Sequence, residues 1–303
     1  MNLKILKLLF CFLFVQIAQA EDWNVVRNDS VRIFYSLGNK TLAEDILDKT
    51  NQNLNELSRI SGLKFTGEVR IFLAKNDDVW NSLTNNRLPD WSQAVTESRL
   101  ATVYLQSKST DGKSLFTVLR HELVHVLIGK NFYQPIIPRW FEEGVALMFS
   151  GENFSDHTSI LSKANLTNSL LSLNEIENVL KFERSKANLA YAESFLSAKM
   201  IVDALGWNGL RLIFKETQIQ QNWPDAFQTV LKMDLNQFEW RLQNEIKQKY
   251  RWNFILQSEL FLWILLPFIA VVVFISIRIR NYKTYRRWEE EENSEEYLNN
   301  EQS

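Results

Sequence analysis

The chain has 303 residues, of which 46% are hydrophobic and 23% are charged, so it can bury one large core or two small ones and is not a disordered or collagen-like polymer. Its 34 basic and 36 acidic side chains give a net charge of −2, which excludes the global positive field typical of nucleic-acid-binding proteins. The single cysteine, Cys11, excludes an intrachain disulfide and a cysteine-ligated zinc site. Any metal must therefore be bound by histidine and carboxylate side chains.

The N-terminus has the layout of a cleavable secretory signal. Two lysines precede an apolar run over residues 8–17, and the small-residue motif Ala-Gln-Ala ends at Ala20. We therefore predict that residues 1–20 are a signal peptide and that the mature chain begins at Glu21. An uncleaved membrane anchor is the alternative, but the apolar run is shorter than the ~20 residues that a span needs.

An exported domain is predicted over residues 21–257. Its first part alternates β-branched or aromatic runs with one helical stretch, which carries apolar residues on one face and ends before Gly62. Strands are predicted at 23–26, 31–35, 69–73 and 101–105, and later amphipathic helices at 191–205, 210–216, 223–231 and 236–250. The predicted fold class is α+β, with an N-terminal mixed β-sheet and helices followed by a helical C-terminal part. The stretch 153–173 is rich in Ser, Asn and Thr and is predicted to be a mobile loop.

A helix predicted after Gly112 contains the motif His-Glu-x-x-His, formed by His121, Glu122 and His125. Two imidazoles four residues apart lie on one helical face, one turn apart, so both can reach a single Zn²⁺ ion. Glu122 lies beside them without being a ligand, and it can take a proton from an attacking water and pass it to a leaving amine. Two histidines that merely pack in a core helix are the alternative, which the rarity of the motif disfavours.

A catalytic zinc also needs a third protein ligand and an open fourth position. The remaining histidine, His157, falls in the polar stretch and is predicted to be solvated surface. Better candidates are the adjacent carboxylates Glu142 and Glu143, in a second predicted helix that starts near Pro138 and can return to the first. The residue types alone leave the choice between these two carboxylates open.

These residues resemble the gluzincin zinc metallopeptidases, and within them the peptidase MA-like group. In that family the third ligand is a Glu on a helix downstream of His-Glu-x-x-His, in the context Trp-Φ-x-Glu-Gly-x-Ala, which matches residues 140–146 here. The resemblance implies a zinc-binding helix pair with Glu143 as the third ligand and Glu142 as a neighbour that shapes the site. It extends from the early strands to Tyr250, although its later motifs are weakly specific.

The resemblance carries further expectations about the site. Tyr191 is a candidate oxyanion donor for a tetrahedral intermediate, the alternative being a Tyr that caps the apolar face of its helix. The strand at 101–105 resembles the edge strand that pairs with an extended peptide substrate, the alternative being a purely structural strand. Thermolysin-like enzymes orient a zinc histidine with an Asp four residues after the ligand Glu, but that position here is Leu147. The acceptor must therefore be a backbone carbonyl or another side chain.

The C-terminal part predicts a membrane anchor. Residues 260–277 contain no charged side chain and are followed by five basic residues within ten positions. This pattern predicts a transmembrane helix over residues 258–279 with the basic flank inside, since Pro267 is tolerated in membrane helices. A buried helix of a soluble domain is the alternative. Residues 280–303 are predicted to be a short charged cytoplasmic tail, and the last sixteen residues, 288–303, are predicted to lack fixed structure.

The sequence therefore predicts a membrane-anchored, Zn²⁺-dependent endopeptidase that hydrolyses peptide bonds of exported or envelope proteins. The zinc domain is expected on the periplasmic or extracellular side of the cell membrane, with a peptide or protein as its partner and no nucleic acid. A non-catalytic receptor or assembly ectodomain that retains the metallopeptidase fold is the alternative. Glu122 favours the enzyme, because a ligand-only site needs no general base.

Overall fold

The computed structural model describes residues 23–36, 38–89, 91–108, 114–132, 136–250 and 260–300. Its contacts divide the chain into two compact units, Met1–Arg251 and Trp252–Ser303. The predicted signal peptide at residues 1–20 lies outside the described residues. The boundaries predicted for the exported domain, the anchor and the tail stay predictions.

The first unit begins with a five-stranded sheet in the order β1-β2-β3-β5-β4. The three central strands β2, β3 and β5 run parallel, and β1 and β4 are antiparallel edge strands. The strands are β1 (Asn24–Arg27), β2 (Val31–Tyr35), β3 (Val69–Ala74), β4 (Ala94–Glu97) and β5 (Thr102–Gln106). The predicted mixed sheet and the α+β class are confirmed.

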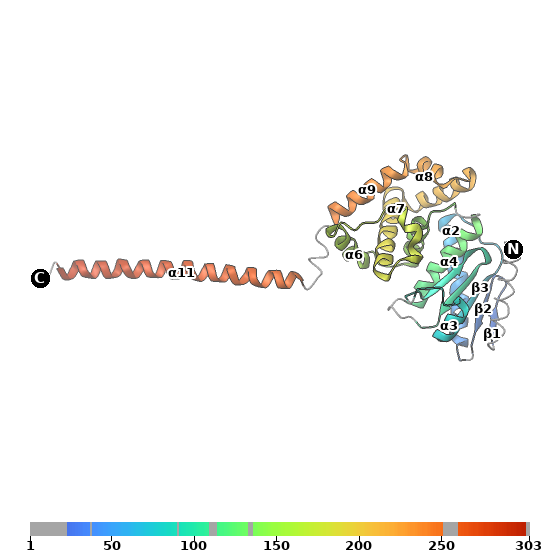
Figure 1. Ribbon diagram of the computed structural model, residues 1–303, viewed down its shortest axis with the longest axis horizontal. Helices are drawn as coiled ribbons and strands as arrows, with labels where there is room; N and C mark the ends of the chain where they lie inside the picture. The colour runs from blue at the N-terminus through green and yellow to red at the C-terminus, as the bar shows by residue number, and fades with distance from the viewer. Residues whose placement is uncertain are drawn as a thin grey trace. The chain divides into compact units, whose positions relative to one another are not determined.

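Alternate side chains of a strand point to opposite sides, and in β2 and β3 they are buried on one face of the sheet and half-buried on the other. One face packs against helices α2 (Lys40–Ser61) and α4 (Leu115–Asn131), as Figure 1 shows. The opposite face packs against the short helix α3 (Asp77–Thr84), through a separate cluster that includes Trp80 and Tyr104. Helix α4, which carries the His-Glu-x-x-His motif, is therefore supported directly by the sheet.

The edge strand was assigned to the wrong segment by sequence reasoning. Strand β5, which contains most of the predicted 101–105 segment, is hydrogen-bonded to β3 on one side and to β4 on the other. The outer strand is β4, connected to β5 by the short 3₁₀ turn η1 (Ser98–Leu100). Because β4 covers β5, the expectation that 101–105 is an edge is wrong.

The second half of this unit is helical. Its helices are α5 (Arg139–Ser150), α6 (Ser155–Leu166), α7 (Arg184–Gln220), α8 (Trp223–Leu231) and α9 (Leu235–Lys249), with the 3₁₀ helix η2 (Glu175–Lys181) between α6 and α7. Helix α5 packs closely on α7: a Cβ at Gly144 would lie 2.2 Å from the backbone oxygen of Ser194. Only glycine permits this close approach, which fixes the position of α5 against α7.

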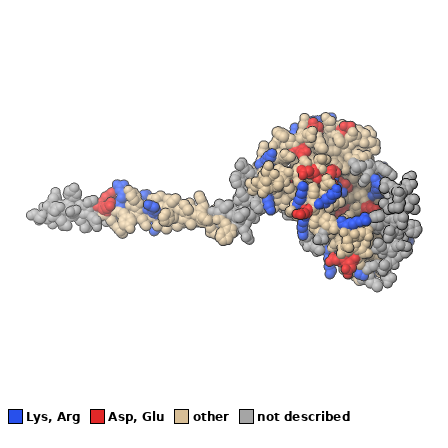
Figure 2. All heavy atoms as spheres, in the orientation of Figure 1, with Lys and Arg blue, Asp and Glu red and all other residues tan. Residues whose placement is uncertain are grey.

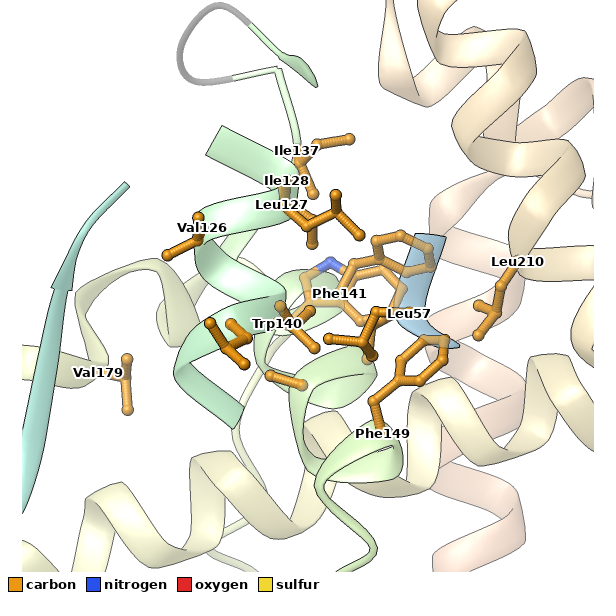
Figure 3. Close-up of a cluster of buried hydrophobic side chains, with 14 of the residues drawn as sticks. Leu57, Val126, Leu127, Ile128, Ile137, Trp140, Phe141, Phe149, Val179 and Leu210 are labelled. Carbon is orange, nitrogen blue, oxygen red and sulfur yellow. The ribbon is translucent and has the colours of Figure 1, made fainter. Parts of the chain in front are cut away.

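The aromatic residues of α5 anchor it in the core. Trp140 and Phe141 are fully buried and point into a cluster that also receives Leu57 from α2, Leu127 from α4 and Leu210 from α7 (Figure 3). Burying an aromatic side chain of this size stabilises the fold by about 2–3 kcal/mol. The carboxylates that follow Phe141 directly in sequence are therefore held on a rigid helix.

A kink at Gly206 separates the two helical stretches predicted within α7, and one predicted loop is a helix. The stretches at 191–205 and 210–216 belong to α7, whose helical geometry is broken at Gly206 with φ 67° and ψ −178°. The predicted mobile loop at 153–173 contains α6, which buries Leu161 and Ala164 in the core. The loop prediction is therefore wrong over α6, because these apolar side chains one turn apart pack inside the fold despite the polar composition around them.

The described part of the second unit is helix α11 (Leu260–Asn300), which includes one segment, Leu265–Glu290, that is long and apolar enough to cross a membrane by length and composition. Figure 2 shows this helix first tan, then blue with basic side chains and then red with acidic ones. The prediction that residues 288–303 lack fixed structure is wrong for residues 288–300, which belong to α11. Good helix formers and pairs such as Arg286 with Glu290, four residues apart, explain this extension.

Candidate metal centre

Three side chains from two helices converge at one point. His121 and His125 come from α4, and Glu143 comes from α5. The Nε2 atoms of the two histidines lie 3.2 Å apart. Glu143 Oε2 lies 3.2 Å from Nε2 of His121 and 3.6 Å from Nε2 of His125. One ligand atom from each residue lies within 4.8 Å of the others, which is the arrangement a metal ion requires. Of the two candidate carboxylates, the structure brings Glu143 to the histidines' Nε2 atoms.

Glu142 occupies a different position beside His125. Its Oε1 atom lies 2.8 Å from Nδ1 of His125, on the side of the ring that faces away from Glu143. An ionised carboxylate only accepts hydrogen bonds, so Nδ1 carries a proton, and the neutral form of His125 in this tautomer presents the lone pair of Nε2. Glu142 therefore supplies the side-chain acceptor that Leu147 does not provide.

Arg139 holds the other oxygen of Glu143. Its Nη2 lies 2.6 Å from Glu143 Oε1, and its Nη1 lies 3.6 Å from Glu142 Oε2. Burial by itself raises the pKa of the Glu143 carboxyl, but the Arg139 guanidinium and then His125 lower it well below its usual range. The Glu142 pKa is also lowered, against the effect of burial, by His125 and Arg139. Both carboxylates stay ionised.

The donor set fits a divalent metal ion. Glu143 Oε2 is buried and has no hydrogen-bond partner among the described residues, while Oε1 is taken by Arg139. The converging atoms are two imidazole nitrogens and one carboxylate oxygen, each of which can offer a lone pair to the same ion. Burial lowers the pKa of His125, but the carboxylates of Glu143 and Glu142 outweigh it and raise the pKa to about 10, so a metal ion at Nε2 would have to displace a proton from this imidazole.

Glu122 lies next to these ligands and is fixed by the edge strand. The Thr96 hydroxyl, on β4, donates to Glu122 Oε2 at 2.5 Å and also lies 3.3 Å from the Glu122 backbone oxygen. Glu122 is buried, and its carboxylate is not part of the metal-ligand cluster. A proton-transferring carboxylate needs this placement beside the ligands rather than among them.

A pocket of about 480 Å³ opens over the centre. It is lined by all three candidate ligands, by Glu122, by residues 92–96 of the edge strand and its approach, and by Tyr191 of α7. The Tyr191 ring packs edge-to-face against Trp91, with ring centroids 6.2 Å apart. Burial, followed by the charge of Glu143, raises the pKa of Tyr191, so its phenol stays protonated and able to donate a hydrogen bond.

The family profile of the Peptidase MA superfamily matches residues 49–248, about two thirds of the chain. The chain belongs to the peptidase MA superfamily. A search of curated proteins found no match. The match begins within α2 and ends within α9, so it includes α4, α5 and the residues that line the pocket. Membership of the peptidase MA superfamily gives the domain a peptidase-type hydrolase fold, as the residues around His121 had indicated.

Three residues of this peptidase MA domain were missed by sequence reasoning. Thr96 and Arg139 received no role, and their contacts with Glu122 and Glu143 depend on the pairing of β4 and on the approach of α5 to α4. His157 was expected at the solvated surface, but it lies on α6, is 8% exposed and lines the pocket. Arg139 alone left a signal in the sequence, since it precedes Glu143 by one helical turn.

Proposed function

We propose that this protein is a membrane-anchored zinc endopeptidase that hydrolyses peptide bonds of exported or envelope proteins. The single observation that carries the proposal is the convergence of His121, His125 and Glu143 beside Glu122, at the floor of a pocket in a peptidase MA domain. A receptor or assembly ectodomain has no need for a buried carboxylate placed beside, but outside, the ligand cluster.

The metal would be held by Nε2 of the two histidines and by Oε2 of Glu143. When bound there, zinc would supply Lewis acidity, which lowers the pKa of water to about 7 and stabilises negative charge on a carbonyl oxygen. Glu142 keeps His125 in the tautomer that presents Nε2, and Arg139 keeps Glu143 ionised and turns its Oε2 toward the histidines.

Glu122 would act as the general base and then as the general acid. Its carboxylate takes a proton from the attacking water and delivers it to the leaving amine. The Thr96 hydroxyl holds Oε2, so the carboxylate does not need to reorient before the transfer. Tyr191, protonated and lining the same pocket, would donate a hydrogen bond to the oxygen that becomes negatively charged.

The edge strand β4 would bind the substrate. It forms the outer edge of the sheet and its residues 94–96 line the pocket, so an extended peptide can add to the sheet as a further antiparallel or parallel strand. Backbone pairing of this kind accepts many sequences, as an endopeptidase requires. It replaces the substrate-pairing role that sequence reasoning gave to residues 101–105.

Helix α11 would anchor the enzyme in the cell membrane as a single span. The apolar part of α11 and the basic residues that follow it favour a topology with the metal centre on the periplasmic or extracellular side and the C-terminus in the cytoplasm. Its substrates would then be proteins on the outer side of that membrane.

The experiment compares Glu122→Gln with His125→Ala in the full-length protein in detergent micelles. Glu122→Gln should keep one zinc per chain and lower cleavage of a peptide library about 100-fold or more, because only the proton-transferring group is lost. His125→Ala should lose zinc and activity together. If wild-type protein with stoichiometric zinc cleaves no peptide, or if Glu122→Gln cleaves as fast as wild type, the proposed function is wrong.

A further inference from the structure

Helix α9 has an exposed face opposite its buried side. The buried side consists of Phe238, Leu242 and Ile246, which follow one another at intervals of four residues. The opposite side, which we call the outer face of α9, consists of Gln237, Trp240, Arg241, Asn244, Lys247 and Gln248. All of these side chains except the half-buried Asn244 are exposed. Most of the outer face is therefore accessible to a partner.

Trp240 is the most exposed large hydrophobic side chain among the described residues of the first unit, at 67%. The tryptophans of α5 and α8, Trp140 and Trp223, are each 1% exposed and belong to the core. Contact with an apolar surface would remove much of the Trp240 ring from water, which is favourable. One exposed apolar residue is common on a protein surface, so the meaning of Trp240 depends on its neighbours.

The charge on the outer face is positive. Arg241 and Lys247 are exposed, and neither forms an ion pair among the described residues. The two glutamates of α9 lie outside this face and have partners: Glu239 accepts a backbone N–H, and Glu245 forms an ion pair within the helix at 2.6 Å. A tryptophan beside basic residues is the combination that favours the headgroup region of an anionic membrane.

The outer face is also close to the proposed membrane span along the chain. Nine residues, 251–259, separate Tyr250 from Leu260, the first residue of α11. Even when fully extended, nine residues span at most about 32 Å, which is less than the diameter of roughly 45 Å of a folded domain of this size. With α11 as the membrane span proposed above, the C-terminal end of α9 is held within that distance of the membrane.

We propose that the outer face of α9 docks on the periplasmic or extracellular leaflet of the membrane that α11 spans. This inference rests on the proposed membrane anchor and adds a second attachment of the same chain. The ring of Trp240 lies at the headgroup level, because it is apolar while its Nε1–H donates a hydrogen bond. Arg241 and Lys247 attract the phosphates of anionic lipids, and the short connection to the span keeps those lipids at high local concentration. The two attachments together restrict rotation of the domain about its anchor.

A fluorophore at a single position tests the docking. Cys11 is the single cysteine, so the full-length Cys11→Ser protein accepts one label, either at Asn244→Cys on the outer face or at Asn55→Cys on the exposed side of α2. Each labelled protein is reconstituted in phosphatidylcholine vesicles with or without about 30% phosphatidylglycerol, and lipids with a nitroxide on the headgroup act as quencher. With phosphatidylglycerol we expect about 2-fold quenching at position 244 and less than about 1.1-fold at position 55.

Two variants of the protein labelled at position 244 separate the effects of charge and ring. Arg241→Gln combined with Lys247→Gln should remove most of the dependence of quenching on phosphatidylglycerol, because the attraction to anionic headgroups is lost. Adding Trp240→Ala to these two substitutions should reduce quenching to the level at position 55, because no interfacial side chain then holds the face on the lipid.

A matched control is Val25→Ala combined with Arg27→Gln, which removes one exposed apolar and one exposed basic side chain from β1, away from α9 (Figure 1). It should leave quenching at position 244 unchanged. Equal quenching at positions 244 and 55, equal quenching with and without phosphatidylglycerol, or quenching that survives the triple variant would overturn the docking. A label signal that grows with the protein-to-lipid ratio would also overturn it, because a second copy of the chain would then occupy the face. Extraction of the protein from vesicles by alkaline carbonate would instead overturn the proposed anchor.

Discussion

Glu143 on α5 and Glu193 on α7 are both 1% exposed, yet they are held in opposite charge states. Glu143 lies 2.6 Å from the Arg139 guanidinium and near two histidines, and its pKa is well below the usual range. Glu193 accepts one backbone N–H, from Leu171 at 3.0 Å, and burial raises its pKa to about 8. The carboxylates of Glu175 and Glu239 add to that rise.

The difference shows that the neighbouring charge, and not burial, decides whether a carboxyl in this domain is ionised. Burial acts in the same direction on both residues, since it disfavours the charged form. At Glu143 an arginine one helical turn earlier reverses the effect and leaves a charged oxygen for a metal. At Glu193 nothing comparable is present among the described residues, so the acid stays protonated at neutral pH and only supports the chain at Leu171.

The largest expected effect comes from removing the negative charge of Glu143 on α5. Glu143→Gln should lose stoichiometric zinc, because a neutral amide is a poor ligand, and should lower the stability of the metal-free protein by about 3 kcal/mol by removing the counter-charge of Arg139. Metal analysis after dialysis and thermal unfolding in detergent measure the two effects. Glu193→Gln is the matched control and should keep one zinc per chain. If Glu143→Gln also retained stoichiometric zinc, the negative charge of Glu143 would not be needed to bind the metal.

A smaller effect is expected at Glu142. Glu142→Ala removes the acceptor that fixes the His125 tautomer and should weaken zinc binding about 10- to 100-fold, as measured by competition with a chromogenic chelator. Glu142→Gln keeps an oxygen that can accept from Nδ1 and should retain most of the affinity. If alanine and glutamine weaken binding equally, the negative charge of Glu142, and not the hydrogen bond, supports the site.

Sequence reasoning was most successful where local pattern and tertiary structure agree. The His-Glu-x-x-His spacing placed His121 and His125 together, and runs of β-branched and aromatic residues predicted β2 and β3. The edge strand β4 was missed because it is short and is defined by its pairing with β5 rather than by its own composition. The burial of His157 was missed because it depends on Phe195, which is far away in the sequence and lies on another helix.

On the α7 side, the charge state of Glu193 predicts a pH dependence of stability. Between about pH 4.5 and pH 8 the unfolded chain ionises this carboxyl while the folded chain does not, so stability decreases as the pH rises and levels off above pH 8. The decrease has an upper limit of about 1.4 kcal/mol per pH unit from this group.

Glu193→Gln should remove that contribution, because the amide is neutral at every pH. The variant is therefore expected to gain stability relative to wild type as the pH is raised from 5 to 8, measured by thermal unfolding in detergent micelles. Glu239→Gln is the control for the general loss of a negative charge nearby. If the difference in stability between Glu193→Gln and wild type stayed constant over this pH range, Glu193 would be ionised in the folded protein. Glu143 and Glu193 would then have the same charge state.

The smallest effect is expected at Glu122, which differs from both carboxylates because its partner is a hydroxyl. Thr96→Val keeps the shape of the side chain and removes the 2.5 Å hydrogen bond to Glu122 Oε2. We expect kcat to fall about 3- to 10-fold with KM and zinc content nearly unchanged, because the general base loses its fixed orientation but not its charge. Thr96→Ser restores the hydroxyl and should restore most of kcat, since strand β4 and the pocket wall are otherwise unaltered. Equal values of kcat for valine and serine would show that the hydroxyl has no part in positioning Glu122, and that the carboxylate is held by its burial on α4 alone.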